Sequence, residues 1–235
     1  MNGPFSAART RPLLAGEKIT RVLPGAVPTI ALEGVSLSVE GGELVAIAGP
    51  SGSGKTTLLA ILGGLDRPTS GRVFLEGEEI YGYSGRALTR FRTERIGFIF
   101  QTHNLLASLT AQENVELAVR MVRGHTVDPR ATATDALATL DLARFSHRLP
   151  IQLSLGEQQR VAVARAIAIK PRVLIADEPT ASLDGNNGER VLEALHAATQ
   201  TGCAVIMASH DERCLRSATR VLHLLDGRLE GASLD

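Results

Sequence analysis

Apolar and polar residues alternate from residue 30 to residue 39, a pattern typical of a strand with one buried face. Glu40-Gly41-Gly42 predicts a turn. Residues 43–48 then form a nearly continuous apolar run, which indicates a strand buried on both faces. A glycine-rich loop and a helical stretch at 57–65 follow directly, so the predicted order is strand, glycine loop, helix.

Residues 104–165 change to helical spacing and are predicted to form an inserted helical lobe. Thr110 and Glu113 carry a capping-box signature, and Asp128-Pro129 opens a second helix with proline in its first turn. Before this lobe the pattern predicts short strands at 72–75 and 96–100 around a polar helix near Leu88.

After the lobe, strands and helices alternate again. The predicted elements are strands at 173–176, 204–208 and 221–225, a helix at 189–198, and a hairpin strand after Asp226-Gly227. Short apolar strands that alternate with helices favour an α/β fold, with a mainly parallel sheet and helices on both faces.

Length and composition fit one compact domain, because the chain has 235 residues, 44% of them hydrophobic. The chain has 25 Lys and Arg residues and 25 Asp and Glu residues, so its formal net charge is zero. No overall basic field exists to hold nucleic acid. No apolar run reaches the ~20 residues of a membrane helix, and no secretory signal is expected. Residues 1–17 are expected to be a flexible tail before a domain at 18–235, and Cys203 and Cys214 to be buried thiols.

The glycine loop has the pattern Gly-x-x-x-x-Gly-Lys-Thr, in which backbone N–H groups and a helix N-terminus bind phosphates. Lys55 is expected to reach the β- and γ-phosphates, and the Thr56 hydroxyl to bind Mg²⁺. An accidental glycine turn is the alternative, but the preceding strand and the following helix favour nucleotide binding. The predicted ATP-binding residues are Gly49, Pro50, Ser51, Gly52, Ser53, Gly54, Lys55, Thr56 and Thr57.

Asp177 and Glu178 end an apolar strand, where a Mg²⁺–phosphate site needs an anionic partner. Asp177 is expected to hold the metal. Glu178, one residue further, would point elsewhere and could polarise a water for in-line attack. The alternative is a pair of solvated loop acids.

Four further segments follow in order: Gln101 after the strand at 96–100, Leu153-Ser-Leu-Gly-Glu-Gln-Gln-Arg160, Ala181-Ser-Leu-Asp184, and His210 after the strand at 204–208. With the two sites above, these six motifs resemble those of the ATP-binding-cassette (ABC) ATPases, from about residue 19 to residue 231. The resemblance implies a P-loop NTPase core, an antiparallel β-subdomain and an inserted α-helical subdomain.

The resemblance also implies a head-to-tail dimer, in which Ser154 and Gly156 of one subunit cover the ATP of the other. Gln101 would contact the metal and the attacking water, and His210 would hold the γ-phosphate, so the implied catalytic residues are Glu178, His210 and Gln101. The implied signature residues are Ser154, Leu155, Gly156 and Glu157, the dimer loop contains Ser182 and Asp184, and the metal site contains Thr56, Gln101 and Asp177.

Purely structural interpretations stay open for several of these residues. Ser154 and Glu157 also form an ordinary helix capping box, and both roles are compatible. A lone histidine such as His210 at a strand end is usually a polar surface residue. The basic run from Arg86 to Arg95 is most simply a solvated helix face, with contact to lipid headgroups as the alternative.

The sequence departs from the family at two positions. Leu155 stands where the signature usually has glycine, and an aliphatic residue near Leu23 stands where the family usually stacks adenine on an aromatic ring. We therefore expect an active site of altered rate, with adenine resting on apolar side chains.

Residues 63–71, Phe100-Gln101 with Asn104-Leu105-Leu106, and residues 109–115 look like the branch that includes lipoprotein-release and macrolide-export ATPase subunits. This likeness implies a peripheral protein on the cytoplasmic face of the membrane, bound to a separate permease near residues 101–115. The alternative is a soluble ABC ATPase that acts on nucleic acid or ribosomes. A single phosphate loop and the short stretch from Gln101 to Ser154 disfavour it, and no nucleic-acid partner is expected.

Overall fold

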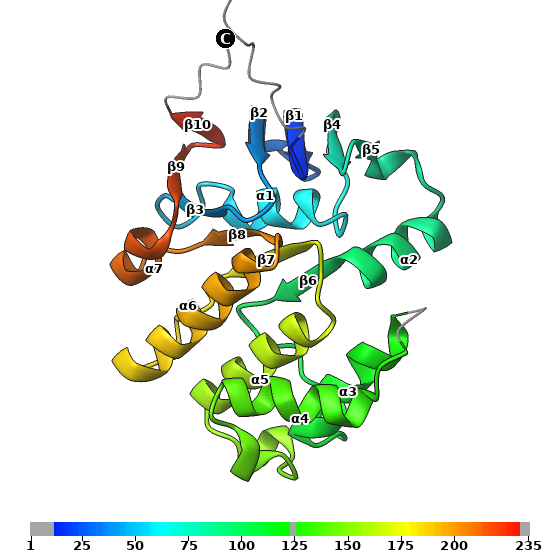
Figure 1. The fold of residues 1–235 in the computed structure, drawn as a ribbon. Coiled ribbons are helices and arrows are strands. Elements are labelled where there is room, and N and C mark those ends of the chain that lie inside the picture. The colour runs from blue at the N-terminus through cyan, green and yellow to red at the C-terminus, as the bar shows by residue number, and fades with distance from the viewer. Residues whose placement is uncertain (1–11, 123–125, 231–235) are drawn as a thin grey trace, which may run out of the picture.

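A computed structural model describes residues 12–122 and 126–230 (Figure 1). The larger sheet has the strand order β10-β9-β3-β8-β7-β6. Its strands are β3 Leu44–Ala48, β6 Ile96–Ile99, β7 Val173–Asp177, β8 Ala204–Ala208, β9 Arg220–Leu225 and β10 Arg228–Glu230. Only β10 pairs antiparallel, so the predicted mainly parallel sheet is confirmed.

A second, antiparallel sheet has the order β2-β1-β4-β5 and lies at the top of Figure 1. Its strands are β1 Leu14–Leu23, β2 Thr29–Val39, β4 Ser70–Leu75 and β5 Glu78–Glu79. This sheet is the antiparallel β-subdomain that the family resemblance implies.

Strand β1 corrects the predicted tail at residues 1–17, because residues 14–17 are paired with β2 and β4. The alternation of β1 is interrupted between Gly16 and Ile19, where the register shifts and Lys18 has φ 48°. Such an irregularity inserts an extra residue and moves later side chains to the other face, so no period of two is visible in the sequence. The rest of the predicted tail, residues 1–11, lies outside the described residues.

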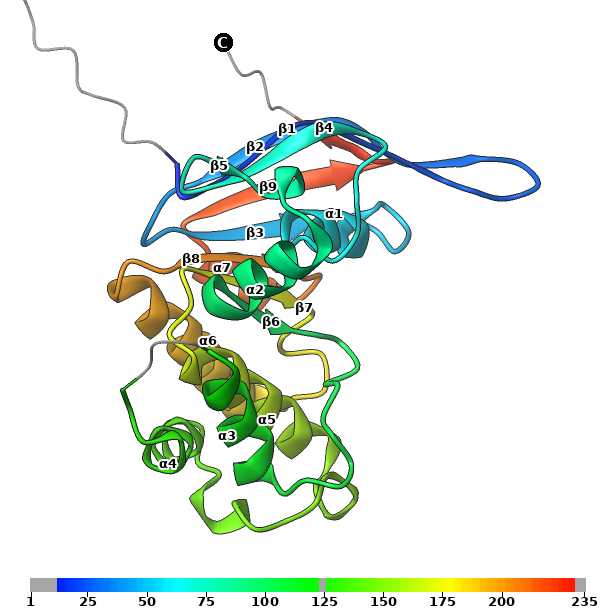
Figure 2. The same ribbon diagram turned by 90° about the vertical axis from the view of Figure 1, so that its right-hand side faces the viewer.

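Helix α1, Lys55–Leu62, packs between the two sheets (Figure 2). Its buried Leu58, Leu59, Ile61 and Leu62 join apolar side chains from both sheets in one core cluster. The other helices around the larger sheet are α2 Gly85–Arg95, α6 Gly185–Gln200 and α7 Glu212–Ser217, with a short 3₁₀ turn, η1, at Ile80–Gly82.

The helical lobe lies at the bottom of Figure 1 and is made of α3 Ala111–Met121, α4 Pro129–Thr139, η2 Ala143–Phe145, η3 Pro150–Gln152 and α5 Leu155–Ala168. Both predicted N-caps are present. The Thr110 side chain accepts from Glu113 N while the Glu113 carboxylate accepts from Thr110 N, and Asp128 accepts from Arg130 N. Helix α5 begins at Leu155 and ends at Ala168, three residues past the predicted end of the lobe.

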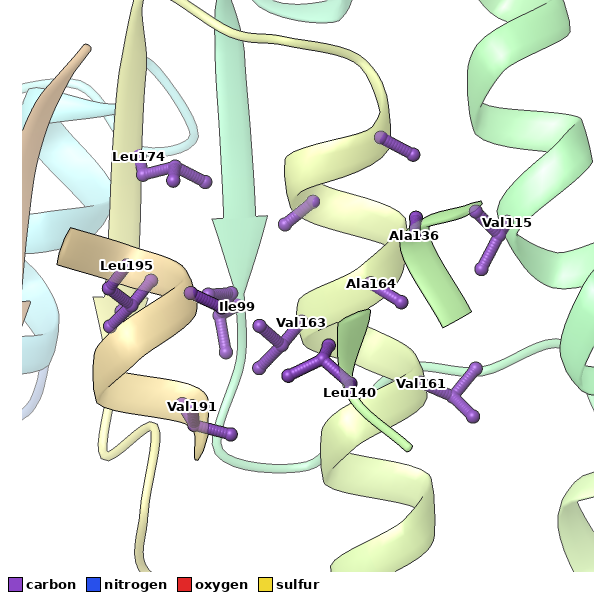
Figure 3. Packing of buried hydrophobic residues seen from close by; sticks show 14 of the residues in the cluster. Ile99, Val115, Ala136, Leu140, Val161, Val163, Ala164, Leu174, Val191 and Leu195 are labelled. Carbon is purple, nitrogen blue, oxygen red and sulfur yellow. The ribbon is translucent and has the colours of Figure 1, made fainter. Parts of the chain in front are cut away.

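One apolar cluster runs from this lobe onto the sheet (Figure 3). It joins Val163 of α5 with Leu140 after α4, Ile99 of β6 and Leu195 of α6. The lobe and the sheet are therefore held by a shared core.

Cys203 and Cys214 are both buried and unpaired, as expected, and burial raises the pKa of Cys203 to about 11. Across residues 12–122 and 126–230, no helix has the length and apolar character that crossing a bilayer requires.

Candidate functional site

The candidate site lies where four parallel strands of the larger sheet end. The glycine loop follows β3, Gln101 lies just after β6, Asp177 and Glu178 stand at the end of β7, and His210 lies after β8. The carboxyl edge of such a sheet is where ligands of open α/β folds bind. The fold therefore brings together the residues that the sequence predicted as one site.

The N-terminus of α1 is open. Gly54 is its N-cap with φ 103°, and no side chain caps the helix. A Cβ at Gly54 would lie 2.5 Å from the backbone oxygen of Ala31, so both the backbone conformation and the space require glycine. The first N–H groups of α1 keep their capacity to bind an anion.

Lys55 folds back over the glycine loop. Its ammonium group donates to the backbone oxygens of Gly49, at 2.7 Å, and Pro50, at 2.8 Å. Ser53 is buried, and its Oγ has no hydrogen-bond partner. The loop thus holds one cation and one unsatisfied buried hydroxyl beside the open helix end, and both suit an anionic ligand.

Thr56 and Asp177 meet across the gap between α1 and β7. The Thr56 hydroxyl donates to Asp177 Oδ2 at 2.8 Å. Burial raises the pKa of Asp177, while the hydrogen bond from Thr56 opposes the rise, the charge of Glu178 adds to it and the charge of Lys55 opposes it. A nearby divalent cation would favour the ionised form of this carboxylate.

Glu178 has a left-handed backbone, with φ 51°, and its carboxylate does not share the Thr56 contact of Asp177. Its two carboxylate oxygens contact different groups: Oε1 lies 2.8 Å from His210 Nδ1, and Oε2 accepts from Ser209 Oγ at 3.2 Å. The Glu178 side chain is 12% exposed, whereas that of His210 is 76% exposed. A carboxylate fixed on both oxygens beside a groove has the geometry of a general base.

These residues line one groove of about 650 Å³. Lys55, Thr56, Gln101, Asp177 and Glu178 all line it. Leu23 and Ile30 line the same groove, and apolar side chains of this kind are where adenine is expected to rest. The full lining is Leu23, Thr29, Ile30, Ala31, Gly49, Pro50, Ser51, Gly52, Gly54, Lys55, Thr56, Thr57, Gln101, Asp177, Glu178, Ala181 and His210.

The signature residues do not line this groove. Ser154 is the N-cap of α5 and forms the expected capping box with Glu157, and Leu155 is 64% exposed. A Cβ at Gly156 would lie 3.2 Å from the backbone oxygen of Ser182, so the signature packs against the predicted dimer loop of its own chain. Asp184, in the same loop, caps α6 by accepting from Asn187 N.

The basic run on α2 is not a simple solvated face. Arg92 donates to the backbone oxygen of Gly64 at 2.7 Å, and Arg95 lies 3.2 Å from Glu76 and 3.3 Å from Glu78. Arg90 pairs with Glu94. These contacts leave less positive charge for lipid headgroups than the sequence suggests.

Sequence reasoning missed two polar residues around the site. Ser209 is fully buried, and its Oγ also accepts from Asp211 N, so it connects Glu178 to the start of α7. Arg165 of α5 contacts the loop after Gln101. A signal for Arg165 exists, since it is the only charged residue in the apolar run 161–169.

The comparisons agree with this geometry. The protein-family description "ABC transporter" matches residues 32–181. The lipoprotein-releasing system ATP-binding protein LolD of Syntrophotalea carbinolica is 44% identical over 202 residues, which cover 85% of this chain and 88% of that protein. The macrolide export ATP-binding/permease protein MacB of Burkholderia pseudomallei is 43% identical over 228 residues, which cover 96% of this chain but 35% of MacB.

Among solved structures, the ATP-binding cassette MJ0796 in a dimeric post-hydrolysis state with ADP and Pi matches with a TM-score of 0.88 and 39% identity. The match covers 92% of this chain and 96% of that one. Fold, site geometry and relatives agree, and the resemblance inferred from the six motifs is confirmed: the chain belongs to the ABC transporter family.

Proposed function

We propose that this chain binds ATP with Mg²⁺ in the groove, hydrolyses it, and thereby powers a separate membrane permease. The observation that carries the proposal is the combination of groups at the sheet edge. The open N-terminus of α1, the Thr56–Asp177 hydrogen bond and the fixed carboxylate of Glu178 occur there together. The names of LolD and MacB support the transport branch, and the cargo is not part of the proposal.

The residues present fit Mg²⁺. Thr56 and Asp177 offer a hydroxyl and a carboxylate oxygen 2.8 Å apart, and Gln101 lines the same groove. The described parts of the chain hold no cluster of three or more His, Cys, Asp or Glu that could bind a metal. Mg²⁺ usually keeps waters and phosphate oxygens and takes few protein ligands, so one hydroxyl and one carboxylate are enough to hold it beside the phosphates. When bound, the ion would neutralise charge on the phosphates.

In the proposed reaction, Glu178 accepts a proton from the attacking water. Ser209 and His210 hold its carboxylate in one orientation, so its position is set before substrate binds. The exposed ring of His210 would hold the γ-phosphate through the nitrogen that does not contact Glu178, while Lys55 and the N–H groups of α1 hold the other phosphate oxygens.

Glu178→Gln tests the hydrolytic role. The amide keeps the shape but cannot take the proton, so turnover should fall by roughly 10²–10⁴ while ATP binding is kept. A dimer should then accumulate with ATP on gel filtration. Glu193→Gln on the exposed face of α6 is the matched control and should leave turnover unchanged. Wild-type turnover by Glu178→Gln would contradict the assignment.

We infer a head-to-tail dimer from the position of the signature. Ser154 and Leu155 are exposed at the start of α5, away from the groove of their own chain, and Ile151 beside them is 90% exposed. In the dimer they would cover the ATP of a second copy, with Ser182 and Asp184 nearby. The similar MJ0796 cassette was solved as a dimer, which supports this arrangement.

We place the permease contact near residues 101–115, on the cytoplasmic face of the membrane. A groove of about 360 Å³ lies beside this segment, lined by Phe98, Phe100, Asn104 and Met121, among other residues. Met121 is 57% exposed. LolD is named as an ATP-binding protein and is matched over 88% of its length, which supports a separate permease chain as the partner. Membrane association that persists without any permease would contradict this placement.

A further inference from the structure

The loop after β6 contains two successive left-handed residues that are not glycine. His103 has φ 60° and Asn104 has φ 49°. Backbone hydrogen bonds run from His103 N to Phe100 O, at 3.1 Å, and from Asn104 N to Thr102 O, at 2.6 Å. This conformation is sparsely populated for residues with a Cβ, so it persists only where the surroundings hold it.

Arg165 supplies a hold from outside the loop. Its guanidinium, carried by α5, donates through Nη1 to the backbone oxygen of Asn104, at 2.5 Å, and through Nη2 to that of His103, at 2.8 Å. Two parallel bonds from one planar group fix orientation as well as distance. Burial lowers the pKa of Arg165, and within residues 12–122 and 126–230 it forms no ion pair. The two carbonyls are therefore its polar partners there.

Arg165 lies beside one groove and holds a loop that leads into a second, the nucleotide groove. It lines the groove of about 360 Å³ together with Asn104, Phe98 and Met121. Two residues before His103, Gln101 lines the nucleotide groove. The turn at 103–104 lies between the two grooves along the chain. The helix that holds it, α5, is the one capped by Ser154 of the signature.

We propose that Arg165 is a positioning residue for Gln101. By fixing both carbonyls of the left-handed turn, it sets where Gln101 lies at the phosphate end of the nucleotide groove. It also ties that position to α5. The inference rests on the proposed function, because it assumes that Gln101 takes part in ATP hydrolysis.

A double-mutant cycle on ATP turnover tests the link, with Arg165→Lys, Gln101→Ala and the double variant in the full chain. Lysine keeps the charge and most of the stem but cannot donate the paired bonds, so turnover should fall by about tenfold. If Arg165 acts through Gln101, adding Arg165→Lys to Gln101→Ala should change turnover little further.

Arg160→Lys is the matched control. Arg160 lies on the same helix and also donates to a carbonyl, that of Leu140 at 3.0 Å, but it does not touch the loop after β6. Its effect should come through stability and add to that of Gln101→Ala. Thermal unfolding of each variant checks that the protein is folded, and Arg165→Met, which keeps an apolar stem, serves if Arg165→Lys folds poorly.

Amide hydrogen exchange gives a readout that does not depend on Gln101. Exchange at residues 101–106 should be faster in Arg165→Lys and unchanged in Arg160→Lys. Additive losses of turnover in the cycle, or unchanged exchange at 101–106, would overturn the proposal. If exchange rises but Gln101→Ala has wild-type turnover, the hold on the turn is supported, whereas the proposed role of Gln101, and with it any effect of Arg165 on catalysis, is refuted.

Discussion

Helices α1 and α5 both begin at points proposed to face the phosphates of ATP, yet their N-termini differ. The N-cap of α1 is Gly54, in a left-handed conformation, and no side chain caps the helix. The N-cap of α5 is Ser154, which with Glu157 closes a reciprocal capping box. One helix end is left open for a ligand, and the other is satisfied by its own side chains.

The difference indicates two modes of phosphate contact. At α1 the N–H groups and the helix dipole are available at all times, so this end can bind nucleotide within a single chain. At α5 the Ser154 oxygen already accepts a hydrogen bond, but its hydroxyl proton can still be donated to a phosphate of a second copy. Glu157 places negative charge in the first turn of α5. The contact of the α5 N-terminus with phosphate should therefore be weaker than that of the α1 N-terminus.

Gly54→Ala breaks the open end and should have the largest effect. An alanine Cβ would meet the Ala31 carbonyl at 2.5 Å and would occupy a left-handed position, so the loop must move. We expect nucleotide affinity to fall on the order of 100-fold or more, measured by titration calorimetry. Gly202→Ala, at φ 86° with open space around it, is the control and should cost about 1 kcal/mol of stability without affecting nucleotide binding. Equal affinity losses in both variants would show that strain alone is responsible.

Ser154→Ala breaks the capped end. Loss of the cap should cost about 1 kcal/mol of unfolding free energy. Loss of the hydroxyl donor should lower turnover and ATP-dependent dimerisation by roughly ten- to 100-fold. Thr110→Ala is the control, because it removes the equivalent capping box at the start of α3. It should lower the unfolding free energy by a similar amount and leave turnover unchanged. If the two variants have the same turnover, the α5 end has no role beyond capping.

Leu155→Gly sharpens the comparison at the residue that departs from the family. Leu155 is 64% exposed at the first position of α5, so its removal opens no cavity. We expect ATP affinity of the monomer to stay nearly constant and turnover to change by less than about tenfold, roughly 1.4 kcal/mol. A far larger gain in the steady-state rate would show that leucine blocks the α5 contact.

Asp211 extends the comparison to a third helix start, where a charged side chain caps α7. A side-chain hydrogen bond from Arg213 is the main cause that lowers the pKa of Asp211 from 3.8 to about 2. A carboxylate with a lowered pKa stabilises the fold above about pH 3.8, and this stabilisation is lost as the pH falls through 2. After allowance for solvent screening we expect about 1 kcal/mol or less. Asp211→Asn and Arg213→Gln should both flatten acid unfolding curves in this range, and an unchanged slope in either would contradict the origin of the shift.

The sequence predicted the phosphate loop, the acids after β7 and most buried strands, because each rests on local patterns such as glycine spacing or continuous apolar runs. Strand β1 was missed because its irregular register near Lys18 removes the alternation. Helix α7 has only six residues, too few for a helical period to be visible. The contacts of Arg165 and Ser209 join segments distant in the chain, so they depend on tertiary packing that no local pattern encodes.

The shared apolar cluster of Figure 3 has a consequence for folding cooperativity. Val163 and Leu140 of the helical lobe belong to the same cluster as Leu174 and Val205 of the sheet. Opening the lobe as a separate unit would expose apolar side chains of both the lobe and the sheet to water, which is unfavourable. We therefore expect lobe and sheet to unfold in one transition, so that the lobe does not fray separately when nucleotide is bound or released.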